Sequence, residues 1–172
     1  LEGAEKIVID GESFEAFNTS GGCATMCETY ENRVETLSYK TIRYPGHLNH
    51  MKFLFNDLHL KKNKEVLEKL FDKEVPRTKN DVIIFFVKVI GLIDGVLQEK
   101  TYLRKIYGDD KYSAIQLTTA SGVCSALKMY LDGKISNKGF VKQESLSWND
   151  FLENKFGQVS VSYTHLRAHE TS

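Results

Sequence analysis

Two Asp-Gly dipeptides, each placed between runs of strand-forming residues, constrain the possible folds of this chain more than any other feature. Asp10-Gly11 joins KIVI to ESFEAF, and Asp94-Gly95 joins FVKVIGLI to VLQEKTYLRKIY. Asp-Gly suits the two-residue turn of a β-hairpin because both residues tolerate a positive φ. The sequence therefore predicts two antiparallel hairpins, one in each half of the chain.

Two further patterns bring the expected number of strands to at least five. VETLSYKTIRY alternates along its length and ends at Pro45, which favours an extended residue before it. The run from Val82 to Ile90 is almost continuously apolar, which predicts a central strand covered on both faces. The short connections favour mostly antiparallel pairing.

Helical periodicity occupies the segments between the strands, over residues 46–60, 63–75, 112–133 and 147–157. Asn63 is the expected N-cap of the second helix, and Gly133 is expected just beyond the end of the third. The last helix begins at Ser147 or Asn149. The predicted class is α+β: a mixed, antiparallel-rich sheet with helices packed on one face, as in a two-layer sandwich.

Composition excludes several classes of function. The 172 residues carry 23 Lys and Arg against 23 Asp and Glu, so no general field attracts nucleic acid or an anionic membrane. The longest apolar run is interrupted by Lys88 and is too short to span a bilayer. An odd cysteine count without framework spacing predicts a reducing, cytoplasmic setting. The start at LEGAEKIVIDG, without Met or a signal-peptide pattern, suggests a fragment of a longer protein.

Cysteine and histidine pairs raise the possibility of metal binding. Cys23 and Cys27 lie one helical turn apart but have no further ligands nearby, so they are predicted to pack as small apolar side chains. His165 and His169 lack both a third ligand and the Glu of H-E-x-x-H, so no metal site is predicted and a metal-dependent hydrolase is the remotest alternative. Their segment, SVSYTHLRAHETS, looks like translated vector sequence. We therefore expect a domain at residues 1–159 and a non-native or disordered tail at 160–172.

Three polar clusters are candidates for binding chemistry: residues 18–22, 43–47 and 118–122. They combine hydroxyls, backbone donors or a cation with a turn or a helix, which suits a carboxylate or an amino acid. Structural alternatives stay open for each. The first cluster would only cap a helix, Arg43 would pair with a surface acid, and the third would allow tight helix packing. The sequence contains no G-x-G-x-x-G, Walker A or G-x-S-x-G motif.

Five segments in the same order carry a resemblance to a known family: FEAFNTSGG, VETLSYKTIRYPGH, MKFLFNDL, SAIQLTTASGVCSAL and GFVKQESLSWNDFLENKFGQV. They resemble the C-terminal region of the saccharopine dehydrogenase-like family, nearest to the bacterial members that group with lysine 6-dehydrogenases. The resemblance runs from Ile9 to Val159.

The resemblance implies an NAD(P)-dependent oxidoreductase that acts on the C–N bond of an amino acid such as saccharopine or lysine. Such enzymes bind NAD or NADP in an N-terminal Rossmann domain, and a second domain covers the substrate and forms the homodimer. This chain resembles only the second domain, so the fragment alone is expected to bind no cofactor and to be inactive. The alternative is a non-catalytic interaction domain that has kept the dimer and lost the ligand site.

The resemblance also implies roles for individual residues. His47 is the catalytic candidate, for orientation or proton exchange, and Arg43 is the candidate for a substrate carboxylate. The remaining candidates for substrate contact are Asn18, Thr19, Ser20, Tyr44, Thr118 and Thr119. The two threonines at 118 and 119 would lie in the same cleft or on the dimer face.

Overall fold

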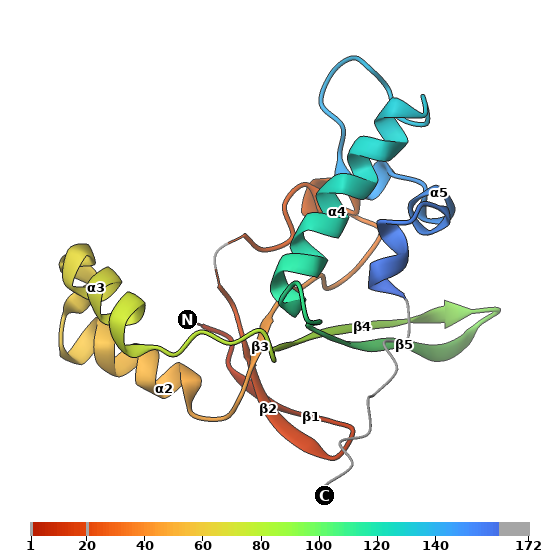
Figure 1. Ribbon diagram of the computed structural model, residues 1–172. Helices are drawn as coiled ribbons and strands as arrows, with labels where there is room; N and C mark the ends of the chain where they lie inside the picture. Colours follow the sequence, from red (N-terminus) through yellow and green to blue (C-terminus); the bar gives the residue numbers. More distant parts are fainter. Residues whose placement is uncertain (1, 20, 162–172) are drawn as a thin grey trace, which may run out of the picture. The chain divides into compact units, whose positions relative to one another are not determined.

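The computed structural model describes residues 2–19 and 21–161, and the chain divides into two compact units, residues 1–77 and 78–172. Each unit has its own sheet and its own helices (Figure 1). The first unit contains β1 (Glu5–Ile9), β2 (Glu12–Phe17), α1 (Met26–Thr29), β3 (Thr41–Arg43), α2 (His47–Lys52), the π-helix η1 (Phe53–Asp57), the 3-10 helix η2 (Leu60–Lys62) and α3 (Lys64–Glu74). The second contains β4 (Val82–Ile93), β5 (Val96–Tyr107), α4 (Ala114–Leu131), the 3-10 helix η3 (Gln143–Ser145), α5 (Trp148–Glu153) and the 3-10 helix η4 (Gly157–Ser160).

The sheet of the first unit has the order β1-β2-β3, with both pairings antiparallel. The predicted hairpin is confirmed, and Asp10 and Gly11 take φ values of 51° and 79°, as its tight turn requires. Phe14 and Ala16 point to one face of β2 and are buried. The long strand predicted before Pro45 is present only in its last part, as β3.

The helices of the first unit follow the predicted periodicity only in part. A single helix is predicted over 46–60. The segment is α-helical in α2, continues as the π-helix η1, and is followed by His59, whose φ of 54° is incompatible with a continued helix. Asn63 caps α3 as predicted, because its side chain accepts a hydrogen bond from the Val66 N–H at 3.3 Å.

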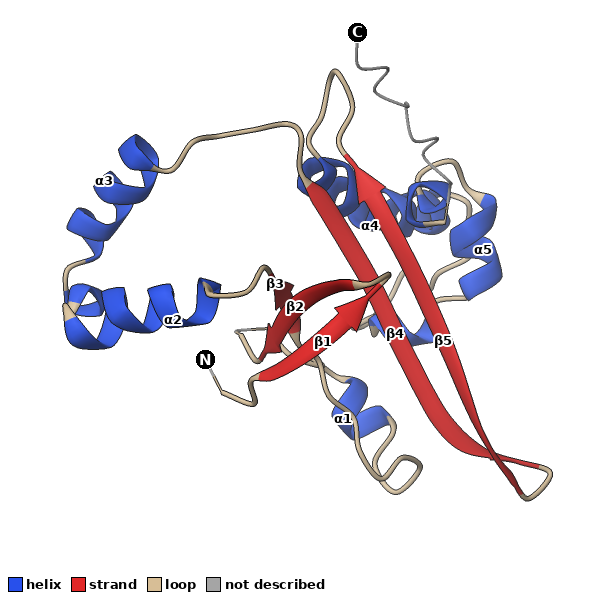
Figure 2. Ribbon diagram, turned by 90° about the horizontal axis from the view of Figure 1, so that it is seen from below, coloured by secondary structure: helices blue, strands red, loops and turns tan. Residues whose placement is uncertain are grey.

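The second unit is built on a two-stranded sheet in which β4 and β5 pair along their whole length (Figure 2). The second Asp-Gly hairpin is thereby confirmed. The strand predicted from Val82 is present, but in the described residues it has β5 as its one partner and is exposed from Phe86 onward. The second unit by itself therefore does not cover this strand on both faces, because an apolar pattern does not say which part of a protein supplies the cover.

Helix α4 packs on β4 and β5, and α5 and η4 pack on α4. A capping box starts α4: the Ser113 side chain accepts from the Gln116 N–H, and the Gln116 side chain accepts from the Ser113 N–H. Gly133 follows the helix with φ of 70°, as predicted. Ser147, not Asn149, caps α5 by accepting from the Asp150 N–H.

The α+β class is confirmed by these helices and antiparallel sheets, and the two-layer arrangement stays a prediction. None of the helices in the described residues combines the length and apolar character needed to cross a membrane. The tail histidines, His165 and His169, lie outside the described residues.

The cysteines near α1 do not both pack in the core. Cys27 is exposed and Cys23 is half-buried in the turn before the helix, so the prediction of core packing is wrong for Cys27. The reason is that α1 begins only at Met26, which leaves Cys23 outside the helical spacing that was expected. Partial burial, with Cys27 beside it, raises the pKa of the Cys23 thiol.

Candidate functional site

The ladder between β2 and β3 positions most of the predicted site residues. Its register sets Phe17 opposite Thr41 and Glu15 opposite Arg43. Asn18 and Thr19 leave one end of this ladder and Tyr44 leaves the other, and the two ends are about 7 Å apart at the rise of a β-strand. Asn18, Thr19 and Tyr44 therefore lie beside the two ends of one short ladder.

Helix α2 brings His47 back across this ladder. The imidazole stacks on the Phe17 ring with 6.2 Å between centroids, although the residue keeps an exposed edge. Partial desolvation lowers the pKa of His47, the nearby Arg43 cation lowers it further, and Glu15 opposes both. His47 is therefore biased toward the neutral form, which can accept a proton.

Glu15 connects the strand to the start of α2. Its two carboxylate oxygens accept hydrogen bonds from the backbone N–H groups of Gly46, at 3.2 Å, and Leu48. These are the N–H groups that an incoming anion would otherwise use at a helix start. A substrate carboxylate at this place must consequently be held by a side chain. Sequence reasoning missed Glu15, although a single acid inside the apolar strand FEAF is a detectable signal.

Arg43 is the cation available for that purpose. Its Nη1 donates to the Ile42 carbonyl at 3.0 Å, and within the described part of the chain the guanidinium forms no ion pair. The alternative of pairing with a surface acid is thus not found in the described residues. Tyr44 lies next to it, 57% exposed, with its ring centroid 5.5 Å from that of Phe14.

The Asn-Thr-Ser-Gly-Gly segment is anchored by its first residues. The Asn18 N–H donates to the Glu2 carbonyl at 2.8 Å, and the hydroxyls of Thr19 and Thr41 lie 2.7 Å apart. Ser20 lies outside the described residues. The capping alternative is wrong for this segment, because α1 begins later, with Thr25 in its N-cap position.

Thr118 and Thr119 lie on α4, in the second unit, whereas the other candidates lie in the first. The Thr118 hydroxyl donates to the Ala114 carbonyl at 2.9 Å, a bond within the helix. The neighbouring Ser121 and Ser125 are buried, as expected if the small residues permit close packing. A ligand role for the two threonines stays a prediction.

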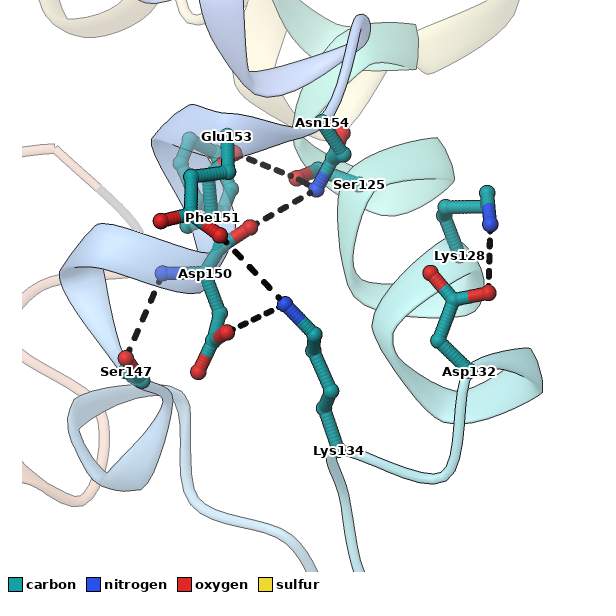
Figure 3. A network of polar contacts seen from close by, with 9 residues as sticks. All are labelled: Ser125, Lys128, Asp132, Lys134, Ser147, Asp150, Phe151, Glu153 and Asn154. Carbon is teal, nitrogen blue, oxygen red and sulfur yellow. Dashed lines mark hydrogen bonds and ion pairs between the residues drawn. The ribbon is translucent and has the colours of Figure 1, made fainter.

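A polar network joins α4 to α5 (Figure 3). The Asn154 side-chain amide donates to the Ser125 hydroxyl at 2.7 Å, and the Lys134 ammonium pairs with Asp150 and with Glu153. The hydrogen bond from Lys134 lowers the pKa of Asp150. These groups satisfy one another, so the network serves the packing of the second unit.

Two cavities of the second unit border this packing. One, of about 350 Å³, is lined by network residues such as Lys134 and Asp150, and the other, of about 440 Å³, lies between α4 and the loop around Ser136. Neither is lined by a residue that the sequence singled out. In the described residues no group of three His, Cys, Asp or Glu side chains could hold a metal ion.

Comparison with known proteins extends over both units. A family model described as the saccharopine dehydrogenase C-terminal domain matches residues 1–157. No solved structure matches the chain.

Proposed function

Since the chain belongs to the saccharopine dehydrogenase C-terminal domain family, we propose that it is the substrate-binding and dimer-forming portion of an NAD(P)-dependent oxidoreductase. The reaction proposed for the parent enzyme takes place at the C–N bond of an amino acid of the saccharopine or lysine type. Family membership is the observation that carries this proposal. The proximity of Arg43 to His47 supports it.

The residues of this chain do not fit a nicotinamide dinucleotide. The sequence has no G-x-G-x-x-G turn, and Glu15 already occupies the backbone donors at the start of α2. We therefore assign NAD or NADP to a Rossmann domain of a longer parent, and we expect the fragment alone to be inactive. The residues of this chain act on the substrate.

The chemistry of the cluster suits an amino-acid substrate. The Arg43 guanidinium has a fork of N–H donors that matches a carboxylate. Tyr44 packs on Phe14, on the other face of the ladder, so its contact with the same ligand is the weaker part of the proposal. Oxidation at a C–N bond requires that the substrate ammonium first lose a proton. His47, whose pKa is lowered, is the group that would accept it. Asn18 and Thr19, with Ser20, would supply further polar contacts.

Replacing Arg43 by alanine tests the substrate role in the full-length parent. We expect Arg43→Ala to raise the KM for the amino acid about 10- to 100-fold, the usual effect of losing hydrogen bonds to a charged group, and to leave the KM for NAD(P) unchanged. Steady-state kinetics with each substrate varied in turn measures both constants. Arg33→Ala is the control, since Arg33 is also exposed in the first unit and stacks over Tyr30. An unchanged amino-acid KM would remove Arg43 from the site.

A second candidate function is a non-catalytic dimerisation or interaction domain, which the apolar ribbon of β4 and β5, exposed within its own unit, favours. It predicts that Arg43→Ala leaves dimerisation unchanged and that the parent has no activity on amino acids. In both interpretations we propose a homodimer and a cytoplasmic location. The cytoplasmic location is supported by the three cysteines, which are all free thiols, the form that a reducing compartment maintains.

A further inference from the structure

Three charged residues form one row across the sheet of the first unit. The register of β1 sets Lys6 opposite Glu15, and the register of β3 sets Arg43 opposite Glu15 from the other side. Directly paired residues of antiparallel strands point to the same face of a sheet, so the three side chains share one face. Phe17 lies on this face too, two residues along β2 from Glu15, and His47 stacks on its ring. The row therefore lies on the same face as His47.

The two faces of this sheet differ in burial. Ile9, Phe14 and Ala16 point to the opposite face and are buried in the core of the unit. Lys6 and Arg43 are exposed, and Glu15 between them is half-buried. Within the first unit, both cations of the row are therefore accessible to a ligand.

Glu15 neutralises neither of these cations. Its carboxylate oxygens accept hydrogen bonds from the N–H groups of Gly46 and Leu48 at the start of α2. A lysine and a glutamate directly opposite each other on paired strands normally attract each other. Among the described residues, however, neither Lys6 nor Arg43 forms an ion pair. The contact between Glu15 and α2 thus leaves two cations available on this face.

The spacing of the row favours two anionic groups over one. Neighbouring strands are about 4.8 Å apart, so the backbones at Lys6 and Arg43 are roughly 10 Å apart, with Glu15 midway. A single carboxylate shared by the two cations would lie over the Glu15 carboxylate and would be repelled by it. Two carboxylates, one toward each end of the row, avoid this repulsion. An amine between them would be attracted to Glu15.

We propose that Lys6 is a further substrate-binding residue, which binds a second carboxylate of the amino acid whose first carboxylate is bound by Arg43. This inference rests on the proposed function and deepens it, because it names the residue that selects a substrate with two separated carboxylates. Saccharopine carries carboxylates on both sides of its amine, whereas lysine carries a single carboxylate. Lys6 therefore favours the saccharopine type over the lysine type.

A matched pair of probes tests Lys6 in the complete chain. Adipate and hexanoate both have six carbons, but only adipate carries a carboxylate at each end. We expect the wild-type chain to bind adipate about 5- to 10-fold more tightly than hexanoate, because solvent screens a charged contact at an exposed site. Lys6→Ala and Lys6→Gln should both abolish this preference. NMR titration of the backbone amides measures the affinities, and the same spectra show whether each variant is folded.

Two control variants separate the charge of Lys6 from other effects. Lys6→Arg should keep the preference for adipate, because it keeps a cation at the same position of the register. Lys62→Ala should keep it as well, since Lys62 is an exposed cation in η2, outside the ladder. Equal affinity of the wild-type chain for the two probes, or a preference that survives Lys6→Ala, would overturn the inference.

Kinetics of the full-length parent distinguish this inference from the proposed function. Lys6→Ala should raise the KM for saccharopine about 5- to 10-fold and leave the KM for lysine unchanged. An unchanged KM for saccharopine in an active parent overturns the role of Lys6 alone. A parent that reduces neither nicotinamide cofactor refutes the proposed function, whereas a preference for adipate that depends on Lys6 would still support the second anion-binding residue.

Discussion

His47 is the residue whose chemistry depends most on its neighbours. Its ring stacks on Phe17, and the Arg43 cation and the Glu15 carboxylate are both close enough to act on its pKa. Desolvation and the cation both favour the neutral imidazole, and the carboxylate opposes them. The protonation of His47 therefore reports whether these residues form the cluster that the structure shows.

The titration of His47 gives a direct prediction. Its pKa should lie below that of the same residue in the urea-denatured chain, which is about 6.5 for an exposed histidine. Arg43→Gln should raise the pKa because a cation is removed, and Glu15→Gln should lower it further because an anion is removed. NMR titration of the imidazole protons measures all three. If His47 had the same pKa in the wild type and in both variants, Arg43 and Glu15 would not lie close to its imidazole.

The same shift sets the sign of a stability effect. The folded state binds a proton at His47 less readily than the unfolded state does, because its folded pKa is the lower one. The contribution of His47 to stability is thus complete above the unfolded pKa and is lost as pH falls through the folded pKa. In Arg43→Gln this loss on acidification should become smaller.

At the level of elements, each unit uses a carboxylate from its sheet region to hold the start of a helix that lies far along the chain. Glu15 does so for α2, and Asp81 does so for α4 by accepting from the N–H groups of Ala114, at 2.6 Å, and Ile115, at 3.1 Å. Asp81 precedes β4, so this contact joins the sheet and α4 of the second unit.

Removing the Asp81 cap should destabilise the second unit. We expect Asp81→Ala to lower the free energy of unfolding by about 1–2 kcal/mol, the usual effect of losing a charged N-cap. Urea denaturation followed by circular dichroism measures the change. Asp110→Ala is the matched control, since Asp110 is exposed in the same region and its contact is made through its backbone carbonyl. Equal stability of the two variants would show that Asp81 contributes nothing to α4.

The sequence predicted those elements whose signals are local. The two Asp-Gly turns, the Asn63 and Ser147 caps and the Gly133 helix end all depend on a few adjacent residues, and all are present. The caps from Glu15 and Asp81 escaped prediction because each acts on a helix more than thirty residues away. No short-range pattern encodes such a pairing.

In the candidate site, too, the residues that are close in sequence were easier to predict than those that are far apart. Arg43, Tyr44 and His47 were predicted together because they are neighbours in RYPGH, and the structure places Asn18 and Thr19 at the other end of one short ladder. The hydroxyls of α4 were grouped with them only by composition. The structure assigns these to the second unit, where helix packing explains the buried serines.

At the scale of the whole molecule, one family model spans both units. The apolar run in β4 predicts cover on both faces, and within the second unit the strand is exposed from Phe86 onward. We propose that the first unit, which carries Arg43 and His47, contacts the substrate.

We propose above all that this chain serves a parent enzyme that oxidises a C–N bond of an amino acid. The most direct measurement is the amino-acid-dependent reduction of NAD or NADP by the purified full-length parent, with saccharopine and lysine as substrates. We expect reduction of one nicotinamide cofactor that requires the amino acid and is weakened by Arg43→Ala. A folded parent that reduces neither cofactor with either amino acid would contradict it and favour the non-catalytic interaction domain.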